Sequence, residues 1–316
     1  MQFKKICILG GTGFVGSAIV TKLAAAGYHV KVLTRRRESA KHLILLPNIQ
    51  VEECHVLDYK ALNNALRGED AVINLLGILH QNRHNSFSTV HHQLPAQLAK
   101  ICADLNINRL LHMSSLGANK NAPSQYLRSK GAGEEALNAA KNGVKITIFK
   151  PSVIFGRSDK FINLFAGLIK MLPVVILAKP DAKFQPIWVE DVASCFVNSL
   201  ENDETYGKTY QLAGPKVYTF RELLQAIMAT LKMSRPIVGL NDPLSYLQAF
   251  MMELLPVKLM SRDNVRSMEI DSITVAPFPA ILGITPTALE TIIPQYLNNQ
   301  TPRGAYDRFR RSAARF

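Results

Sequence analysis

The first half of the chain alternates short apolar runs with segments that repeat apolar residues at helical spacing. The apolar runs predict strands at 4–9, 29–33, 50–54, 70–75, 109–114 and 145–150, and the helical repeats predict helices at 14–26, 59–67, near 89–105 and near 124–142. This alternation is typical of an α/β fold in which helices cover both faces of a parallel sheet. Right-handed crossovers bring the carboxyl ends of such strands to one edge, where ligands bind.

The pattern changes after Pro151 to shorter and more mixed elements. Helices are predicted near 160–170, 190–200 and 219–232, with prolines at their edges. A chain of 316 residues exceeds what one doubly wound sheet needs by roughly 100 residues. We therefore expect a second, smaller lobe of mixed structure in the C-terminal half.

The first predicted strand runs directly into a glycine-rich turn that opens a helix. The turn consists of Gly10, Gly11, Thr12, Gly13, Phe14, Val15 and Gly16. Gly10 or Gly11 allows a tight turn, Gly13 lets the backbone approach a pyrophosphate, and Gly16 lets the helix pack closely on the sheet. The helix N-terminus then offers unpaired N–H groups to the phosphates. The pattern predicts a dinucleotide-binding site, and the alternative is a turn that merely connects two elements.

The end of the second predicted strand indicates which dinucleotide is bound. The carboxylate that accepts the ribose 2′-OH of NAD is absent there, and Arg35, Arg36 and Arg37 follow Thr34 instead. Arginine forks match phosphate oxygens, so Arg35 and Arg36 favour a 2′-phosphate, and NADP(H) is preferred over NAD(H). In the alternative, the arginines form a solvated loop face and Glu38 is a displaced ribose acceptor.

These motifs define the predicted organisation. We expect a Rossmann-type domain at 1–155 and 185–215, a smaller mixed substrate lobe at 156–184 and 216–300, and a basic, aromatic tail at 301–316. The stretch 243–260 is apolar but too interrupted by charges and proline to span a bilayer, and it fits an amphipathic or lobe-capping helix. Residues 303–316 carry five arginines interleaved with aromatic residues, which predicts either binding to anionic lipid or a solvated end.

Charge and cysteine content restrict the function classes. The formal net charge is +13, yet no nucleic-acid-binding signature accompanies it, so we expect no nucleic acid partner. The four cysteines lie far apart without CxxC spacing, which is typical of buried thiols in a reducing compartment. Without a secretory signal, we expect a protein that is either cytoplasmic or peripheral on the cytoplasmic face of the inner membrane. No metal site is expected, because His80, His84, His91 and His92 lack accompanying carboxylates, and we expect these histidines on a solvated face.

Acid–base chemistry is predicted for Tyr126 and Lys130. The two residues are four apart at the start of a predicted helix, so their side chains project toward the same space. A nearby ammonium stabilises a phenolate and brings the phenol pKa toward neutrality, and Lys130 also suits the nicotinamide ribose. At the end of the preceding strand, a hydroxyl from Ser114 or Ser115 is placed to hold a substrate carbonyl.

In these motifs the chain resembles the short-chain dehydrogenase/reductase superfamily, in its extended or atypical branch. The matching positions are the Gly10–Gly16 turn, Asp58, Asn74 to Gly77, Ser114 and Ser115, Tyr126 and Lys130, Lys150 to Gly156, and Trp188 to Ala193. The resemblance implies that Asp58 borders the adenine, that Leu76 and Gly77 lie along the cofactor, and that Pro151, Ser152 and Val153 flank the nicotinamide. Asp58 also has the simpler reading of a helix cap.

A more specific similarity is to bacterial relatives of the nucleotide-binding accessory subunit of respiratory complex I, alpha-subcomplex subunit 9. It is carried by Ser114 to Ala118, Tyr126 to Glu134, Leu282 to Glu290 and Pro294 to Leu297. Members of that family in complex I bind NADPH tightly and are regarded as structural, so the resemblance leaves turnover open. The intact Tyr126 and Lys130 pair keeps catalysis chemically feasible.

Three hypotheses for function follow. The first is an NADP(H)-binding oxidoreductase near the inner membrane, linked to a quinone or to complex I, with an unidentified small-molecule substrate. The second is a non-catalytic NADPH-binding protein that assembles with a respiratory complex. The third is a nucleotide-sugar epimerase or dehydratase, against which the three arginines argue because such enzymes usually favour NAD.

Overall fold

The computed structural model describes residues 3–81, 85–140, 143–254 and 260–297. Among these residues the largest sheet has seven strands, each parallel to its neighbours, in the order β11-β6-β5-β4-β1-β2-β3. The strands are β1 (Lys5–Leu9), β2 (His29–Thr34), β3 (Ile49–Glu53), β4 (Ala71–Asn74), β5 (Arg109–Met113), β6 (Lys145–Pro151) and β11 (Thr209–Leu212). The strand order reverses between β1 and β4, and ligands bind at such a switch point. The predicted α/β, Rossmann-type doubly wound sheet is therefore confirmed.

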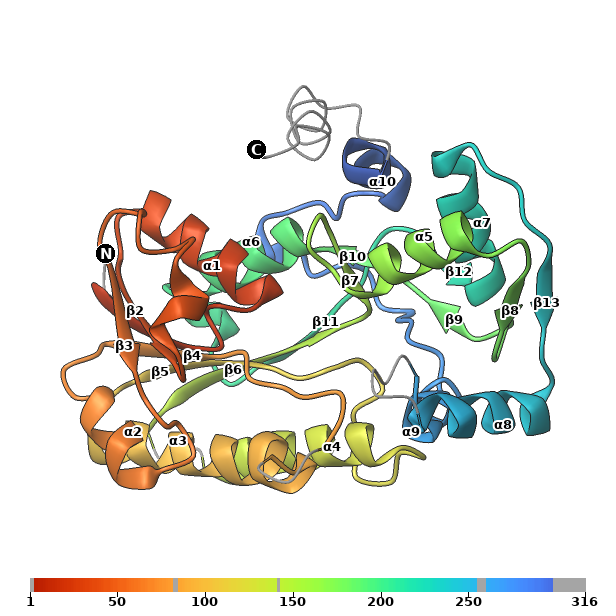
Figure 1. The fold of residues 1–316 in the computed structure, drawn as a ribbon. Coiled ribbons are helices and arrows are strands. Elements are labelled where there is room, and N and C mark those ends of the chain that lie inside the picture. The colour runs from red at the N-terminus through yellow and green to blue at the C-terminus, as the bar shows by residue number, and fades with distance from the viewer. Residues whose placement is uncertain (1–2, 82–84, 141–142, 255–259, 298–316) are drawn as a thin grey trace, which may run out of the picture. The chain divides into compact units, whose positions relative to one another are not determined.

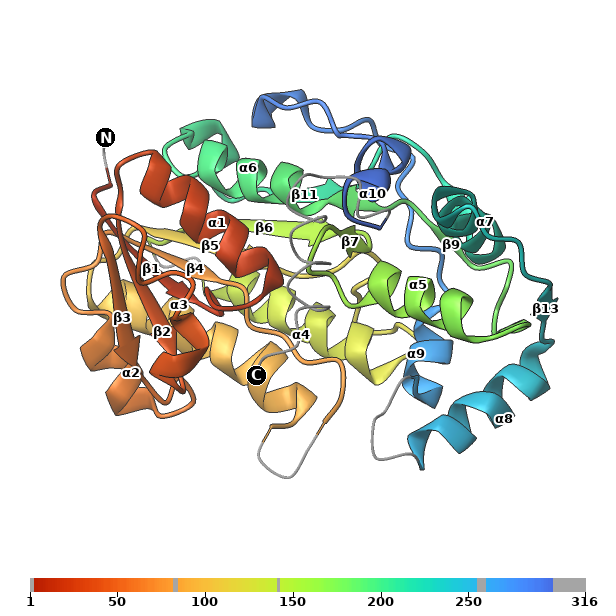
Figure 2. The same ribbon diagram turned by 45° about the horizontal axis from the view of Figure 1, so that its top comes forward.

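Helices cover both faces of this sheet. They are α1 (Phe14–Ala25), α2 (Tyr59–Ala65), α3 (Leu94–Asp104), α4 (Gln125–Ala139) and α6 (Val189–Ser199). Figure 1 shows α2, α3 and α4 along one face and α1 and α6 along the other, and the turned view of Figure 2 agrees. Because both faces are covered, the central strands are almost entirely apolar, as the burial of β1 and β4 shows.

The single helix predicted near 89–105 is divided in the structure. Residues Ser88–Gln93 form a wide π-helical turn, and α3 begins only at Leu94. Pro95 has no N–H to donate to the carbonyl of His91, which stands four residues before it, so the regular helical ladder is interrupted there. A Cβ added to Gly133 would lie 2.0 Å from the same carbonyl oxygen, so α4 packs closely against the widened turn.

Arg109 at the start of β5 is fully buried, and no carboxylate among the described residues pairs with it. Its guanidinium donates to the carbonyls of Lys145, Ser199 and Leu200 and to the hydroxyls of Thr147 and Thr205. The ring of Tyr206 lies 4.5 Å from the guanidinium carbon. Burial lowers the pKa of Arg109 to about 10, and the bonds join β5 to β6 and to the end of α6.

The chain divides into two compact units. The first comprises residues 1–151, 189–212 and 274–285, and the second comprises 152–188, 213–273 and the described residues from Pro286. Residues 152–155, 185–188 and 213–215, which are expected in the Rossmann-type domain, fall in the second unit. Residues 274–285, which are expected in the substrate lobe, fall in the first unit. They join the first unit because Asn198 of α6 donates to the carbonyl of Leu282, and Thr274 donates to Gln211 of β11.

The second unit has short two-stranded sheets and helices. Its strands are β7 (Ile154–Phe155) with β10 (Ile187–Trp188), β8 (Val175–Leu177) with β13 (Ile237–Gly239), and β9 (Lys183–Phe184) with β12 (Tyr218–Thr219). Its helices are α5 (Phe161–Met171), α7 (Phe220–Leu231), α8 (Asp242–Glu253), α9 (Arg262–Ser267) and α10 (Leu289–Leu297). In its core the buried rings of Phe184 and Phe220 pack against the partly buried rings of Phe161 and Phe165.

Only one of the two segments considered for membrane binding lies largely within the described residues. The apolar stretch 243–260 forms α8 up to Glu253, whereas 255–259 and the tail at 301–316 lie outside the described residues. Within the described part of the chain, no helix is both long and apolar enough to cross a bilayer.

Candidate functional site

The glycine-rich turn lies at the switch point of the sheet. Gly10 follows β1 directly and has a φ of +82°, a conformation that favours glycine, and a Cβ there would lie 3.3 Å from the carbonyl carbon of Leu75 after β4. The N–H of Gly13 donates to the carbonyl of Gly10 at 3.1 Å, which closes the turn. Helix α1 then begins at Phe14 with no side-chain cap and no acidic residue in its first turn. Its N-terminal N–H groups and positive dipole end therefore suit an anionic ligand.

The space around the glycines differs from one to the next. A Cβ on Gly16 would lie 2.2 Å from the carbonyl oxygen of Gly10 and 2.6 Å from the Cα of Gly11, so helix and turn touch through their backbones. A Cβ on Gly13 would meet only the Gly10 oxygen, at 3.3 Å, and Gly13 is exposed. The structure thus requires glycine at position 16 for its own packing, whereas Gly13 leaves open space that a pyrophosphate fits.

The segment after β2 presents an unpaired cationic surface. The Thr34 hydroxyl accepts from the N–H of Arg36 and donates to its carbonyl, which shapes the turn. The side chains of Arg35 and Arg36 are exposed, and no carboxylate of the described residues forms an ion pair with them. Glu38, the alternative ribose acceptor, is exposed and paired with Lys41. The exposed guanidinium groups give this segment a positively charged surface.

Asp58 caps a helix in this structure. Its carboxylate accepts from the N–H groups of Lys60 and Ala61 at the start of α2, at 2.9 and 3.1 Å. The simpler reading of this residue therefore holds. Both bonds use the same carboxylate oxygen, Oδ1, so neither of them involves Oδ2. The contact of Asp58 with an adenine stays a prediction.

The structure distinguishes the two serines that the sequence left as alternatives. A hydrogen bond with Ser115 lowers the pKa of Tyr126, while burial raises it more strongly. Ser114 instead donates its hydroxyl to the carboxylate of Glu134 on α4. Ser115 is thus the hydroxyl that accompanies the phenol, and Ser114 belongs to a separate polar network.

Lys130 lies buried beside the segment that follows β4. Its ammonium donates to the carbonyl of Met113 at 3.0 Å, and a Cβ on Gly77 would lie 3.3 Å from its Nζ. Burial lowers the pKa of Lys130 to about 8, against an opposing effect of Glu134. The expected lowering of the Tyr126 pKa by Lys130 is not found among the described residues, because burial of the phenol dominates. Lys130 is nevertheless placed beside Leu76 and Gly77, where the resemblance puts the cofactor.

His91 was expected on a solvated face, and this expectation is wrong, since the side chain is 1% exposed. Its Nε2 accepts from the N–H of Ile78 at 3.0 Å, so its Nδ1 carries the proton and donates to Ser129 at 2.8 Å. The Ser129 hydroxyl in turn donates to the carbonyl of Tyr126. Burial lowers the pKa of His91 to about 3, which keeps the ring neutral. The ring also lies edge-on to Tyr126 at 5.5 Å, so His91 links the Ile78 segment to α4.

The expected nicotinamide segment contributes its hydroxyl to internal packing. Pro151 ends β6, and its carbonyl accepts from the N–H of Leu116 at 2.9 Å. In the second unit, Ser152 is 5% exposed and donates its hydroxyl to the carbonyl of Ser272 at 2.6 Å. Val153 accepts from the N–H of Ile187 through its carbonyl. A contact of Ser152 with a cofactor would therefore use its backbone.

The sequence of the chain is similar to those of known proteins. The model of the NAD dependent epimerase/dehydratase family matches residues 6–213. The chain is 32% identical over 281 residues to mitochondrial NADH dehydrogenase (ubiquinone) 1 alpha subcomplex subunit 9 of Arabidopsis thaliana, covering 84% of this chain and 69% of the plant protein. It is 29% identical to the protein of the same name in Mus musculus, covering 90% and 77%.

The fold is similar to that of solved sugar nucleotide enzymes. A double mutant of DesIV, the dTDP-glucose 4,6-dehydratase of Streptomyces venezuelae, solved with NAD and DAU bound, superposes with a TM-score of 0.73. The two sequences are 19% identical, and the match covers 96% of this chain and 99% of the other. At this identity the similarity concerns the fold alone.

Proposed function

The chain belongs to the NAD dependent epimerase/dehydratase family, and from this premise we propose that it is an NADP(H)-binding oxidoreductase-type protein that acts on a carbonyl or quinone substrate. The single observation that carries the cofactor assignment is the uncapped N-terminus of α1 behind a turn whose Gly13 leaves open space. Gly10, Gly11, Thr12, Phe14, Val15 and Gly16 complete the proposed phosphate site, and Leu76, Gly77 and Lys130 follow along the cofactor.

Preference for NADP(H) is proposed from the arginines after β2. Replacing Arg35 and Arg36 together with alanine should weaken NADPH binding about 100-fold, because each loses a charge-assisted bond to the 2′-phosphate, and should leave NADH binding nearly unchanged. The measurement is a titration of reduced nicotinamide fluorescence with cofactor-free protein at fixed salt. A double alanine variant of the exposed Arg67 and Lys208 has the same charge change and serves as the control. Equal affinities for NADPH and NADH in the unmodified protein would contradict the preference.

The proposed chemistry assigns separate roles to Tyr126, Ser115 and Lys130. NADPH, when bound, supplies the hydride for reduction of a carbonyl or quinone. The Tyr126 phenol is protonated at neutral pH, because burial raises its pKa, and is therefore set to donate its proton to the reduced substrate oxygen. The Ser115 hydroxyl orients that oxygen, and Lys130 holds the ribose. Pro151 and Val153 flank the nicotinamide in this proposal.

Replacing Tyr126 with phenylalanine tests this chemistry. We expect turnover to fall about 100- to 10,000-fold, since this is the usual contribution of general acid catalysis, while the Kd for NADPH changes less than about threefold. Oxidation of NADPH is followed by absorbance against a panel of quinones and carbonyl compounds. Undiminished activity in the variant would remove Tyr126 from the mechanism.

A second candidate function is favoured by the relatives that are named as subunits of NADH dehydrogenase (ubiquinone). In this reading the protein holds NADPH for stability, associates with a respiratory complex, and lies peripherally at a membrane. It predicts that NADPH stays bound through purification and that none of the panel compounds oxidises it. The third candidate, a nucleotide-sugar epimerase or dehydratase, draws on the fold match to DesIV, and tight NAD binding would favour it.

A further inference from the structure

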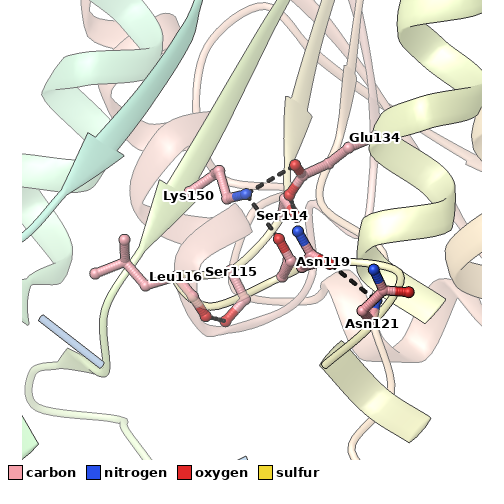
Figure 3. Close-up of polar contacts among 8 residues, drawn as sticks. Ser114, Ser115, Leu116, Asn119, Asn121, Glu134 and Lys150 are labelled. Carbon is pink, nitrogen blue, oxygen red and sulfur yellow. Dashed lines mark hydrogen bonds and ion pairs between the residues drawn. The ribbon is translucent and has the colours of Figure 1, made fainter. Parts of the chain in front are cut away.

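A buried carboxylate lies next to the proposed catalytic group without belonging to it. Glu134 stands one helical turn after Lys130 on α4, and its side chain is 14% exposed. One carboxylate oxygen accepts from the Ser114 hydroxyl, and the other accepts from the ammonium of Lys150 at 2.8 Å. Figure 3 shows Ser114 and Lys150 both pointing toward Glu134. Both oxygens are thus engaged, as a buried carboxylate requires.

The same network holds the segment that carries Ser115. Lys150 also donates to the carbonyl of Ala118 at 3.0 Å, so one ammonium joins α4, β6 and the far end of this segment. Backbone bonds from Ser114 and Leu116 to β6 fix its beginning. A Cβ on Gly131 of α4 would lie 2.5 Å from the carbonyl carbon of Asn119, which brings the helix against the segment's end.

Glu134 also determines the charge around Lys130. The titratable groups that interact with this ammonium are Glu134 on α4, His91 on the π-helical turn, and His112 on β5. Burial lowers the pKa of both histidines, so these rings stay neutral near pH 7. The Glu134 carboxylate opposes the lowering of the Lys130 pKa that burial causes.

We propose that Glu134 is a positioning residue, which holds the Ser115 segment against α4 and supplies the negative charge that faces Lys130. The inference rests on the proposed cofactor site, because Lys130 is taken to hold the ribose of a bound, strongly anionic dinucleotide. Glu134 acts through Lys130, Ser114 and Lys150, and it is assigned no contact with substrate.

The experiment compares Glu134→Gln with Glu135→Gln by measuring the Kd for NADPH from pH 6 to pH 9.5. Glu135 is the next residue on the helix, is exposed and pairs with Lys120, so it is matched in chemistry and charge. In the unmodified protein, affinity should fall about tenfold as pH rises through the Lys130 pKa of about 8, because the site loses a positive charge. Lys130→Met should abolish this pH dependence of NADPH affinity, which would show that it arises from titration of Lys130.

In Glu134→Gln the pH at which NADPH affinity falls should decrease by about one unit, and the affinity at pH 6 should be nearly unchanged. In Glu135→Gln the affinity should depend on pH as it does in the unmodified protein. Lys150→Met should raise the pH at which NADPH affinity falls. This variant removes the ammonium that pairs with Glu134, so the carboxylate stabilises the charge of Lys130 more strongly. This second variant keeps the test decisive where Glu134→Gln does not fold. A merely structural role would weaken binding equally at every pH, and parallel curves would overturn the inference. Absence of NADPH binding by the unmodified protein would instead refute the proposed function.

Discussion

Replacing Gly16 with alanine is expected to lower the free energy of unfolding by about 2 kcal/mol and to weaken NADPH binding at least about 100-fold. The added Cβ would lie 2.2–2.8 Å from three backbone atoms of Gly10 and Gly11, which no side-chain rotation relieves. Overpacking of this kind costs about 3 kcal/mol, whereas the better helix propensity of alanine returns at most about 1 kcal/mol. The clash therefore dominates, and the turn must move away from α1. Chemical denaturation and fluorescence titration measure the two effects.

Two further glycine variants separate packing from binding. Gly13→Ala should change stability by less than about 1 kcal/mol, because Gly13 has a φ of −79° and open space, yet it should reduce NADPH affinity about tenfold or more. Gly167→Ala in α5, where a Cβ meets nothing within 4 Å, is the control and should be neutral or slightly stabilising. Normal NADPH binding by Gly13→Ala would show that the pyrophosphate does not lie in the open space at this turn.

Replacing Arg109 with methionine is expected to destabilise the protein by about 4 kcal/mol, which corresponds to a loss of roughly 10 °C in thermal midpoint. Methionine fills most of the volume but leaves the carbonyls of Lys145 and Leu200 without the guanidinium donor, and the carbonyl of Ser199 keeps only the hydroxyl of Thr205. Each unsatisfied buried group costs about 1–3 kcal/mol, which outweighs the saving from no longer burying a charge.

The control for this prediction is Arg67→Met. Arg67 is exposed, so its loss should change the midpoint by less than about 2 °C. Unfolding followed by circular dichroism and by calorimetry gives both midpoints. Equal stability of the two variants would mean that α6 and β6 stay joined without the guanidinium, and that the carbonyls find other donors.

Much of the fold was predictable because its signals are local. The strand, glycine turn and helix at the N-terminus are contiguous in sequence, and each glycine position follows from backbone geometry that a short segment determines. The strand and helix alternation similarly gave the doubly wound sheet, since parallel strands buried on both faces are almost wholly apolar. Only β11 of the main sheet was not expected, and it is short and alternates buried with exposed residues.

The features of the site that the sequence did not predict depend on contacts between residues far apart in the chain. The choice between Ser114 and Ser115 needed the position of Glu134, which comes from another element. His91 was expected in solvent because it lies among polar residues at the start of a predicted helix, whereas the π-helical turn before Pro95 buries it. Glu134 and Lys150 are 16 residues apart, and nothing in sequence spacing pairs a helix residue with one on the following strand.

The division of the chain has a consequence for synthesis on the ribosome. A nascent chain that has reached only Pro151 already contains six strands of the main sheet, but it lacks β11 at the edge and α6 against α1. It also lacks the carbonyls of Ser199 and Leu200 that Arg109 requires. The first compact unit therefore cannot complete its fold from residues 1–151 alone, and a fragment ending at residue 151 would expose apolar surface and aggregate.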